Sequence, residues 1–271
     1  MKRATSLFYG TFCYLTFLFA FLYAIGFVGN FAVPKTIDGK VQDPLFQAIL
    51  VNACLLLLFA LQHSIMARPA FKKWWTRFVP QHLERSTYVL LASLCLLLLM
   101  WQWRPIGGVV WSVESNILKA LLHTTFFIGW TIVLVSTFLI NHFDLFGLRQ
   151  VWLYVQNKPY TPLPFRVPIF YRFVRHPLYL GFIIAFWSTP TMTVAHLLFA
   201  LLTTGYILTA IRFEEHDLQL HFGRKYRDYK KTVPMIMPFS KRKTVSITHE
   251  SNHVNDHVKE TKLQKELEER W

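Results

Sequence analysis

The chain has 271 residues, of which 53% are hydrophobic and only 16% are charged, and its mean hydropathy is +0.31. A soluble domain of this length is rarely so apolar, so the composition predicts a polytopic, all-α integral membrane protein. The formal net charge of +14 lies in loops beside apolar blocks, where it indicates topology and contact with membrane lipids; we therefore do not expect nucleic acid as a partner.

Four apolar blocks of spanning length occupy the first half of the chain. We predict transmembrane helices at residues 7–28, 45–66, 88–103 and 120–140. The first block is too long for a signal peptide and no small-residue cleavage site follows it, so we expect a retained helix. The third block is short, and we expect it to begin earlier, at residues 86–87, or to end at Trp101 or Trp103.

The loops between these blocks differ in charge. The loop after the second block has an excess of four positive charges and interleaved tryptophans, which predicts a cytoplasmic loop with a short amphipathic segment at the interface. The loops at 29–44 and 104–119 carry little net charge and are predicted to lie outside. Both termini are then expected on the cytoplasmic side.

The second half alternates between polar and apolar segments. Residues 143–176 contain four prolines and an excess of four positive charges, which predicts an ordered cytoplasmic connection. Residues 178–211 are too long for one crossing and are interrupted near Pro190, so we expect a helical hairpin and six spans in all. The count falls to five if the hairpin enters without crossing. Residues 214–243 are basic and are expected to form a short interfacial helix.

We expect one membrane domain at residues 1–243, made of a four-span part at 1–142 and a second part at 143–243. The polar tail at 244–271 has the composition of a disordered segment or a loose helix. Its three histidines, spaced by four residues, are interpreted as solvated, and we expect no metal site. The sequence does not predict the oligomeric state.

The richest set of polar groups beside an apolar block lies in the turn YRFVRHPLYLG at residues 171–181. Pro177 lacks a backbone N–H and suits the first turn of a helix, and Gly181 allows another backbone to approach closely. Glu214 and Glu215 return to the same membrane face after the hairpin. These features favour a binding site over an ordinary interfacial anchor.

The sequence RHPLYLG, followed after the hairpin by EE, resembles the cofactor-binding half of the membrane methyltransferases typified by isoprenylcysteine carboxyl methyltransferase and phosphatidylethanolamine methyltransferase. The motifs LQHS (61–64), ERSTY (84–88) and HFDLFGLR (142–149) are similar to the nurim branch of that superfamily, and most similar to the bacterial methanethiol S-methyltransferases. This resemblance implies S-adenosylmethionine as cofactor, methanethiol as a small thiol substrate, dimethyl sulfide as product, and the bacterial inner membrane as location.

Cofactor-binding roles fall on residues on both sides of the hairpin. Arg175 suits a carboxylate of the cofactor, and Glu214 or Glu215 suits its ammonium or ribose hydroxyls, with an ambiguity of one residue. Tyr171 and Tyr179 offer aromatic faces to the adenine or the sulfonium. The full predicted set is Gln156, Tyr171, Arg175, His176, Pro177, Leu178, Tyr179, Arg212, Glu214 and Glu215.

A thiol acceptor needs help to lose its proton, because it is mostly protonated at neutral pH. We predict His63 or His142 as the base and Arg85 as the positive charge that favours the thiolate. For each histidine the alternative is a helix cap or a head-group contact.

Two other functions stay open. The acceptor could instead be a prenylated cysteine, a phospholipid amine or an isoprenoid acid, and a wide opening to lipid between spans would favour this. The chain could also be a nurim-like structural or partner-binding protein without catalysis, although the intact turn and acidic pair argue against it.

Overall fold

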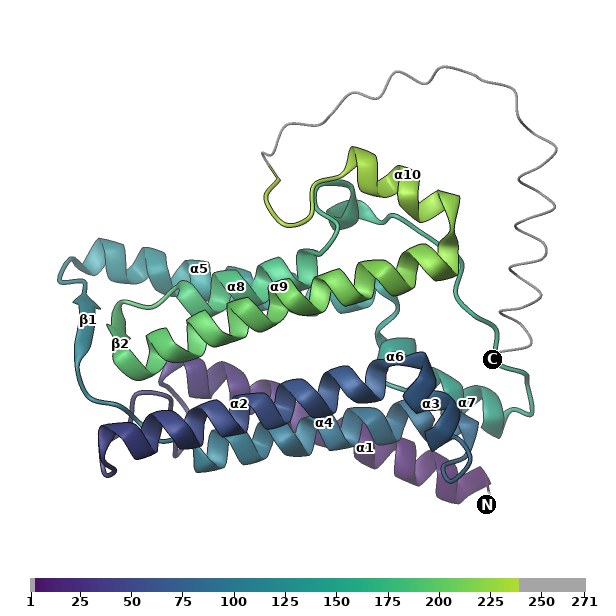
Figure 1. Cartoon of the computed structure of the whole chain (residues 1–271), viewed down its shortest axis with the longest axis horizontal. Coiled ribbons are helices and arrows are strands. Elements are labelled where there is room, and N and C mark those ends of the chain that lie inside the picture. Colours follow the sequence, from purple (N-terminus) through teal and green to yellow (C-terminus); the bar gives the residue numbers. More distant parts are fainter. Residues whose placement is uncertain (1–2, 239–271) are drawn as a thin grey trace.

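The computed structural model describes residues 3–238, which form a bundle of long helices (Figure 1). Within this range, five helices are long and apolar enough to cross a membrane: α1 (Arg3–Gly29), α2 (Leu45–Ala67), α4 (Gln81–Gln102), α5 (Asn116–Ile140) and α9 (Val194–Phe222). The prediction of an all-α integral membrane protein is confirmed. The tail at 244–271 and its histidines lie outside the described residues.

Shorter elements connect these helices. They are α3 (Pro69–Trp75), α6 (His142–Leu145), α7 (Leu148–Val155), the 3₁₀ turn η1 (Ile169–Arg172), α8 (Pro177–Trp187), α10 (Arg224–Thr232) and the strands β1 (Val109–Ser112) and β2 (Thr191–Thr193). We call the end of the bundle that carries α3, α7 and α10 the α10 end, and the opposite end, with the two strands, the β end (Figure 1). The antiparallel pairing of β1 with β2 was not anticipated from the sequence.

Two predicted boundaries need correction. Helix α4 begins at Gln81, earlier than either start that we expected for the third span. Helix α9 continues to Phe222, so Glu214 and Glu215 lie within it and not in a separate interfacial segment. The helix can extend past the apolar block because no proline or glycine follows Ile211 until Gly223, whose φ of +55° suits glycine and ends the helix.

The fifth predicted span, the first arm of the hairpin, corresponds to α8, and the interruption falls where it was expected, between Trp187 and Val194. With 11 residues, α8 is about 16 Å long, whereas the hydrocarbon core is about 30 Å thick. It is therefore too short to cross by itself. Its first residue, Pro177, and the preceding His176 are buried, and the helix packs against α5 and α9.

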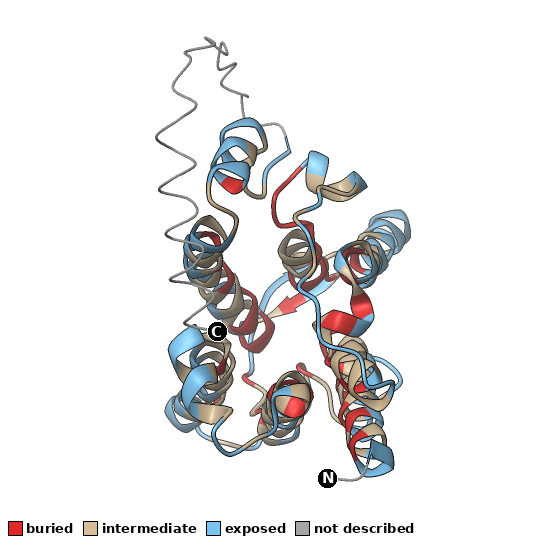
Figure 2. Ribbon diagram, turned by 90° about the vertical axis from the view of Figure 1, so that its right-hand side faces the viewer, coloured by how far each residue is buried: buried red, intermediate tan, exposed pale blue. Residues whose placement is uncertain are grey.

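Two glycines bring the backbones of α5 and α8 into contact. A Cβ at Gly129 would lie 2.8 Å from the carbonyl oxygen of Gly181, and a Cβ at Gly181 would lie 2.7 Å from that of Gly129. Trp130 and Phe186 extend this contact into the main core. Figure 2 shows buried residues on the inward faces of the bundle, while α3 and α10 are largely exposed. The close approach that Gly181 predicted therefore fixes the position of α8 and its first turn.

Candidate cofactor and acceptor site

A buried cluster of charges joins the turn before α8 to α9 and α10. Glu215 Oε1 lies 2.6 Å from Arg175 Nε and 3.1 Å from His176 Nε2, and Glu215 Oε2 lies 2.7 Å from Lys230 Nζ. Arg175, His176 and Glu215 are each at most 9% exposed. Buried charges are tolerated only with such partners, so both oxygens of Glu215 are satisfied within the protein. We call these four residues the Glu215 cluster.

Arg175 also fixes the segment that follows α10. Its Nη1 donates to the carbonyl oxygens of Lys230 at 3.0 Å and Val233 at 2.5 Å, and its main-chain N–H donates to Pro234 at 2.9 Å. These bonds hold α10 over the turn. A contact between Arg175 and a cofactor carboxylate would have to form beside them, and it stays a prediction.

Glu214 differs from its neighbour Glu215. Its Oε2 is buried and has no hydrogen-bond partner among the described residues, since His176 Nδ1 is 3.8 Å away. The side chain of Glu214 is 43% exposed, against 6% for Glu215. An unpartnered carboxylate oxygen is costly unless a ligand supplies a donor. The structure thus separates two residues that the sequence left ambiguous: Glu215 is satisfied, and Glu214 can accept from a ligand.

Tyrosines surround Glu214. Burial and the Glu214 charge raise the pKa of Tyr171, whose main-chain oxygen accepts from Tyr229 at 2.6 Å. The hydroxyl of Tyr179 lies next to the Glu214 carboxylate, and its ring is 5.7 Å from that of His176. Carboxylate oxygens and aromatic faces together suit a cationic ligand.

A second set of polar side chains comes from α2, α4 and α9. The hydroxyl of Tyr88 lies 3.0 Å from the ring nitrogens of His63, and that of Tyr206 lies 3.0 Å from Ser64 Oγ. We call these four residues the His63 group. Tyr88 and Tyr206 are both electrostatic neighbours of Tyr179, so the His63 group adjoins the Glu214 side of the Glu215 cluster.

The structure brings two of the three predicted catalytic residues together. Arg85 lies on α4, less than one turn before Tyr88, and it is an electrostatic neighbour of both His63 and Tyr88. A thiol placed between His63 and Tyr179 would therefore meet a nitrogen base and a positive charge.

The third predicted catalytic residue, His142, occupies an aromatic enclosure. Its Nε2 lies 2.9 Å from the hydroxyl of Tyr14 and its Nδ1 2.8 Å from Thr137 Oγ1, while Phe138 stacks on the ring at 4.1 Å. Its exposure is 4%, and burial lowers the pKa of His142. Each nitrogen of His142 faces a hydroxyl of its own, whereas the single Tyr88 hydroxyl faces both nitrogens of His63 and can bond to one of them at a time, so the geometry favours His63 over His142 as the base.

The remaining predicted residues divide between the turn and the surface. Pro177 opens α8 as expected, with Leu178 half-buried in the same turn. Arg212 is exposed on α9, and Gln156 is exposed at the end of α7, which packs against α1 and α4. No contact described within residues 3–238 brings Gln156 or Arg212 to the Glu215 cluster, and their predicted cofactor contacts stay untested.

Sequence reasoning missed four residues of this site. Ser64 adjoins His63 in the motif LQHS, which was a usable signal. Tyr206 lies within an apolar span, where its single hydroxyl was overlooked. Lys230, and Tyr226 with a buried hydroxyl that has no partner among the described residues, come from α10. Their positions depend on how α10 folds back, which no local pattern encodes.

Comparison with known proteins gives the family. The chain is 55% identical over 244 residues to a methanethiol S-methyltransferase of Crocosphaera subtropica, a match that covers 90% of this chain and 96% of that protein. A methanethiol S-methyltransferase of Mycobacterium tuberculosis is also 55% identical over 244 residues, covering 90% of this chain and all of that protein. The chain belongs to the methanethiol S-methyltransferase family.

Members of this family have more distant relatives. Nurim of Xenopus laevis is 32% identical over 197 residues, 68% of each chain, which confirms the resemblance inferred from the motifs. No family profile matches the sequence, and no solved structure does.

Proposed function

We propose that this member of the methanethiol S-methyltransferase family transfers a methyl group from S-adenosylmethionine to methanethiol, giving dimethyl sulfide. The names of its relatives support the reaction. The observation that carries the proposal is the buried, unpartnered Oε2 of Glu214 beside Tyr179 and His176. That oxygen marks a place where the fold supplies an acceptor and a ligand must supply the donor.

The residues around Glu214 fit the proposed cofactor. S-adenosylmethionine, when bound, supplies a methyl group on a positively charged sulfonium. Glu214 would accept from its ammonium or ribose hydroxyls, and Tyr171 and Tyr179 would present aromatic faces. The Glu215 cluster would hold the turn and α10 in place around it, because its charges are paired internally. Arg175 then acts by positioning the site, in addition to any contact of its own.

The acceptor thiol would bind at the His63 group. His63 would take the thiol proton, with Tyr88 holding the imidazole ring, and Arg85 would favour the thiolate. The thiolate sulfur would then be aligned with the methyl carbon by the walls of the site, which is the main demand of this direct displacement.

The rings around the His63 group favour a small acceptor. The ring of Phe59 lies 5.4 Å from that of His63 and 6.3 Å from that of Tyr206, so it packs between α2 and α9 beside the His63 group. A prenyl or acyl chain would have to displace these aromatic side chains, whereas methanethiol would not. The site therefore supports the small thiol over a lipid acceptor.

We further propose that the α10 end faces the cytoplasm of a bacterial inner membrane. The last turns of α3 and α10 both carry lysine pairs, Lys72 with Lys73 and Lys230 with Lys231. Positive loops favour the cytoplasmic side, and that is also where the cofactor is made available by metabolism. Tags placed at this end and at the β end, tested for labelling in intact cells, check this orientation.

The experiment that tests the reaction is headspace detection of dimethyl sulfide from membranes that contain the full chain. Separate samples receive S-adenosylmethionine with methanethiol, a prenylated cysteine or phosphatidylethanolamine, and methyl-labelled cofactor reports transfer to the last two. We expect transfer to methanethiol alone. Labelled lipid or prenylcysteine without dimethyl sulfide would overturn the acceptor assignment, and cofactor binding without any transfer would overturn the proposed reaction.

A further inference from the structure

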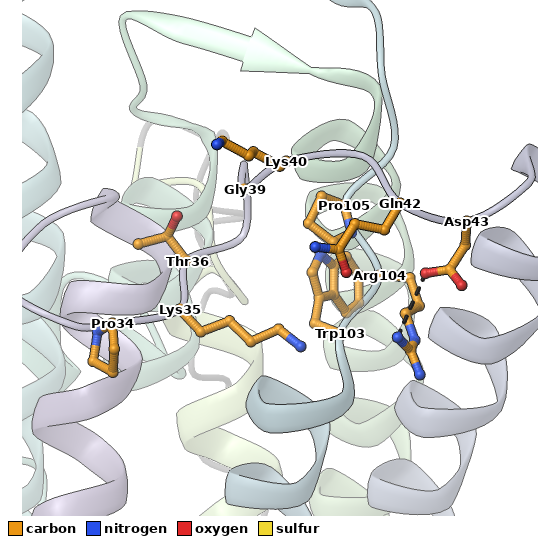
Figure 3. Close-up of a pocket in the computed structure, with 10 residues that line it drawn as sticks. All are labelled: Pro34, Lys35, Thr36, Gly39, Lys40, Gln42, Asp43, Trp103, Arg104 and Pro105. Atoms are coloured by element: carbon orange, nitrogen blue, oxygen red, sulfur yellow. Dashed lines mark ion pairs between the residues drawn. The ribbon is translucent and has the colours of Figure 1, made fainter.

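A pocket of about 320 Å³ lies at the β end, far from the Glu215 cluster along the bundle. It opens between the loop that joins α1 to α2 and the residues that follow α4 (Figure 3). Lys35, Lys40 and Arg104 line it, together with one acidic residue, Asp43. The pocket is thus large enough for a small ligand and carries an excess of positive charge.

The positive charge of the pocket arises from how the fold distributes the acids of this loop. By sequence the loop is neutral, because Lys35 and Lys40 balance Asp38 and Asp43. Asp38, however, does not line the pocket. Its carboxylate accepts from Asn30 Nδ2 at 2.6 Å and from the Thr193 hydroxyl, and it lies 3.4 Å from His196 Nδ1. The carboxylate of Asp38 is therefore bound outside the pocket. Among the residues that line the pocket, Asp43 is the one acid beside three cationic side chains.

Arg104 is fixed at its backbone but loosely held at its guanidinium. The fully buried Asn52 donates to the main-chain oxygen of Arg104 at 2.7 Å and accepts from its main-chain N–H at 2.8 Å. The guanidinium contacts Asp43 Oδ2 and Gln102 Oε1 only at 3.5 Å. The two hydrogen bonds with Asn52 therefore fix the backbone of Arg104 beside the pocket and leave its guanidinium able to bind a ligand.

Lys35 lies on the other side of the pocket, with its side chain directed along the floor toward Trp103 (Figure 3). Its ammonium donates to the main-chain oxygen of Trp101. Burial and the charge of Arg104 lower the pKa of Lys35, and Asp43 opposes this only in part. A second anion in the pocket would relieve the repulsion between Lys35 and Arg104.

We propose that this pocket binds a phosphate group through Arg104 and Lys35, with Lys40 at its rim, as the head group of an anionic phospholipid or as a free phosphate ion. Arginine matches phosphate oxygens in a bidentate manner, and lysine adds a point charge. The pocket lies just beyond the end of α4 and before the start of α2, at the depth of lipid head groups. This binding site is separate from methyl transfer and does not depend on it.

The test measures thermal unfolding of the full chain purified in a neutral detergent. Phosphatidylglycerol, phosphatidylcholine and inorganic phosphate are added in separate samples. We expect phosphatidylglycerol to raise the Tm of the wild type by several degrees, and a Lys35→Gln, Arg104→Gln double variant to lose this shift. Lys119→Gln removes a positive charge at the same end outside the pocket and should keep it. An equal shift with inorganic phosphate identifies the free ion as the source, and its absence identifies the lipid.

A pocket-filling variant covers the case in which the double variant does not fold. Thr36 lines the pocket and is uncharged, so Thr36→Trp fills the space without altering electrostatics. It should also lose the shift caused by phosphatidylglycerol. A full shift in either variant, or equal shifts with phosphatidylcholine and phosphatidylglycerol and none with phosphate, would overturn the proposal.

Discussion

Each end of the bundle holds a buried histidine paired with a carboxylate, and the two pairs differ in what remains unsatisfied. At the β end, His196 is 1% exposed, its Nε2 lies 3.0 Å from the main-chain oxygen of Phe186, and Asp38 meets donors from Asn30, Thr193 and His196. At the α10 end, Glu215 is equally satisfied, but Glu214 beside it is not. The pair of Asp38 and His196 attaches the loop between α1 and α2 to α9. The pair of Glu215 and His176 lies next to Glu214, whose carboxylate can accept a hydrogen bond from a ligand.

The largest effect on stability is expected from removing the charge of Glu215, the fully paired carboxylate at the α10 end. Glu215→Gln leaves the buried Arg175 and the partly exposed Lys230 beside a neutral amide, which should destabilise the fold by about 3–5 kcal/mol. Chemical unfolding in detergent measures this. Asp228→Asn removes an exposed acid from α10 and serves as the control, with little expected change. Equal stability of the two variants would contradict the role given to Glu215.

The next largest effect is expected at His63, where a substitution should change the rate of the reaction without changing the structure of the cofactor site. His63→Gln should lower kcat roughly a hundredfold, because it removes the proposed base, while binding of S-adenosylmethionine stays as in the wild type. Dimethyl sulfide formation and cofactor binding are measured on the same preparation. His123→Gln, the same change at an exposed histidine of α5, should leave both unaltered. Wild-type turnover in His63→Gln would remove His63 from the mechanism.

The β-end pair should show a smaller effect, and only on stability. Asp38→Asn keeps the shape but weakens the contacts with His196 and Thr193, which should cost about 1–3 kcal/mol of unfolding free energy. Its kcat and cofactor affinity, measured below the unfolding temperature, should match those of the wild type. Loss of cofactor affinity would show that the two ends are coupled and that the comparison fails.

The smallest effect concerns pH and the third buried histidine. Because burial lowers the pKa of His142 in the fold, the unfolded chain binds more protons below about pH 6.5. The stabilisation is therefore present above the unfolded pKa and is lost as the pH falls through the folded value. Between pH 7 and pH 5 the Tm of the wild type should fall more than that of His142→Gln. If the Tm of both proteins fell equally between pH 7 and pH 5, the lowered pKa of His142 would be contradicted.

Much of the fold follows from local sequence patterns. Apolar blocks set the long helices, Pro177 set the start of α8, and Gly181 indicated the contact with α5. The extension of α9 to Phe222 was missed because helix propensity continues after hydrophobicity ends. Composition, spacing and motifs were therefore enough to predict the membrane class and the polar turn at residues 171–181.

The division of roles within the site could not be predicted in this way. Consecutive helical residues point about 100° apart, so only the packing of the turn against α9 decides that Glu215, and not Glu214, meets Arg175. Likewise, His63 and His142 both end apolar blocks, and their difference arises from Tyr14 and Thr137, which lie on other segments or turns. Whether a buried polar side chain finds a hydrogen-bond partner depends on tertiary packing, which local sequence patterns do not specify.

The most direct test of the central claim is the binding of S-adenosylmethionine to purified wild type, Glu214→Gln and Glu114→Gln, measured by calorimetry. Hydrogen bonds to a charged group contribute roughly 1.5–3 kcal/mol, so Glu214→Gln should bind about ten- to a hundredfold more weakly with an unchanged Tm. Glu114→Gln, an exposed change at the β end, should bind as the wild type does. Wild-type affinity in Glu214→Gln would contradict the claim that the unpartnered carboxylate oxygen marks the cofactor site.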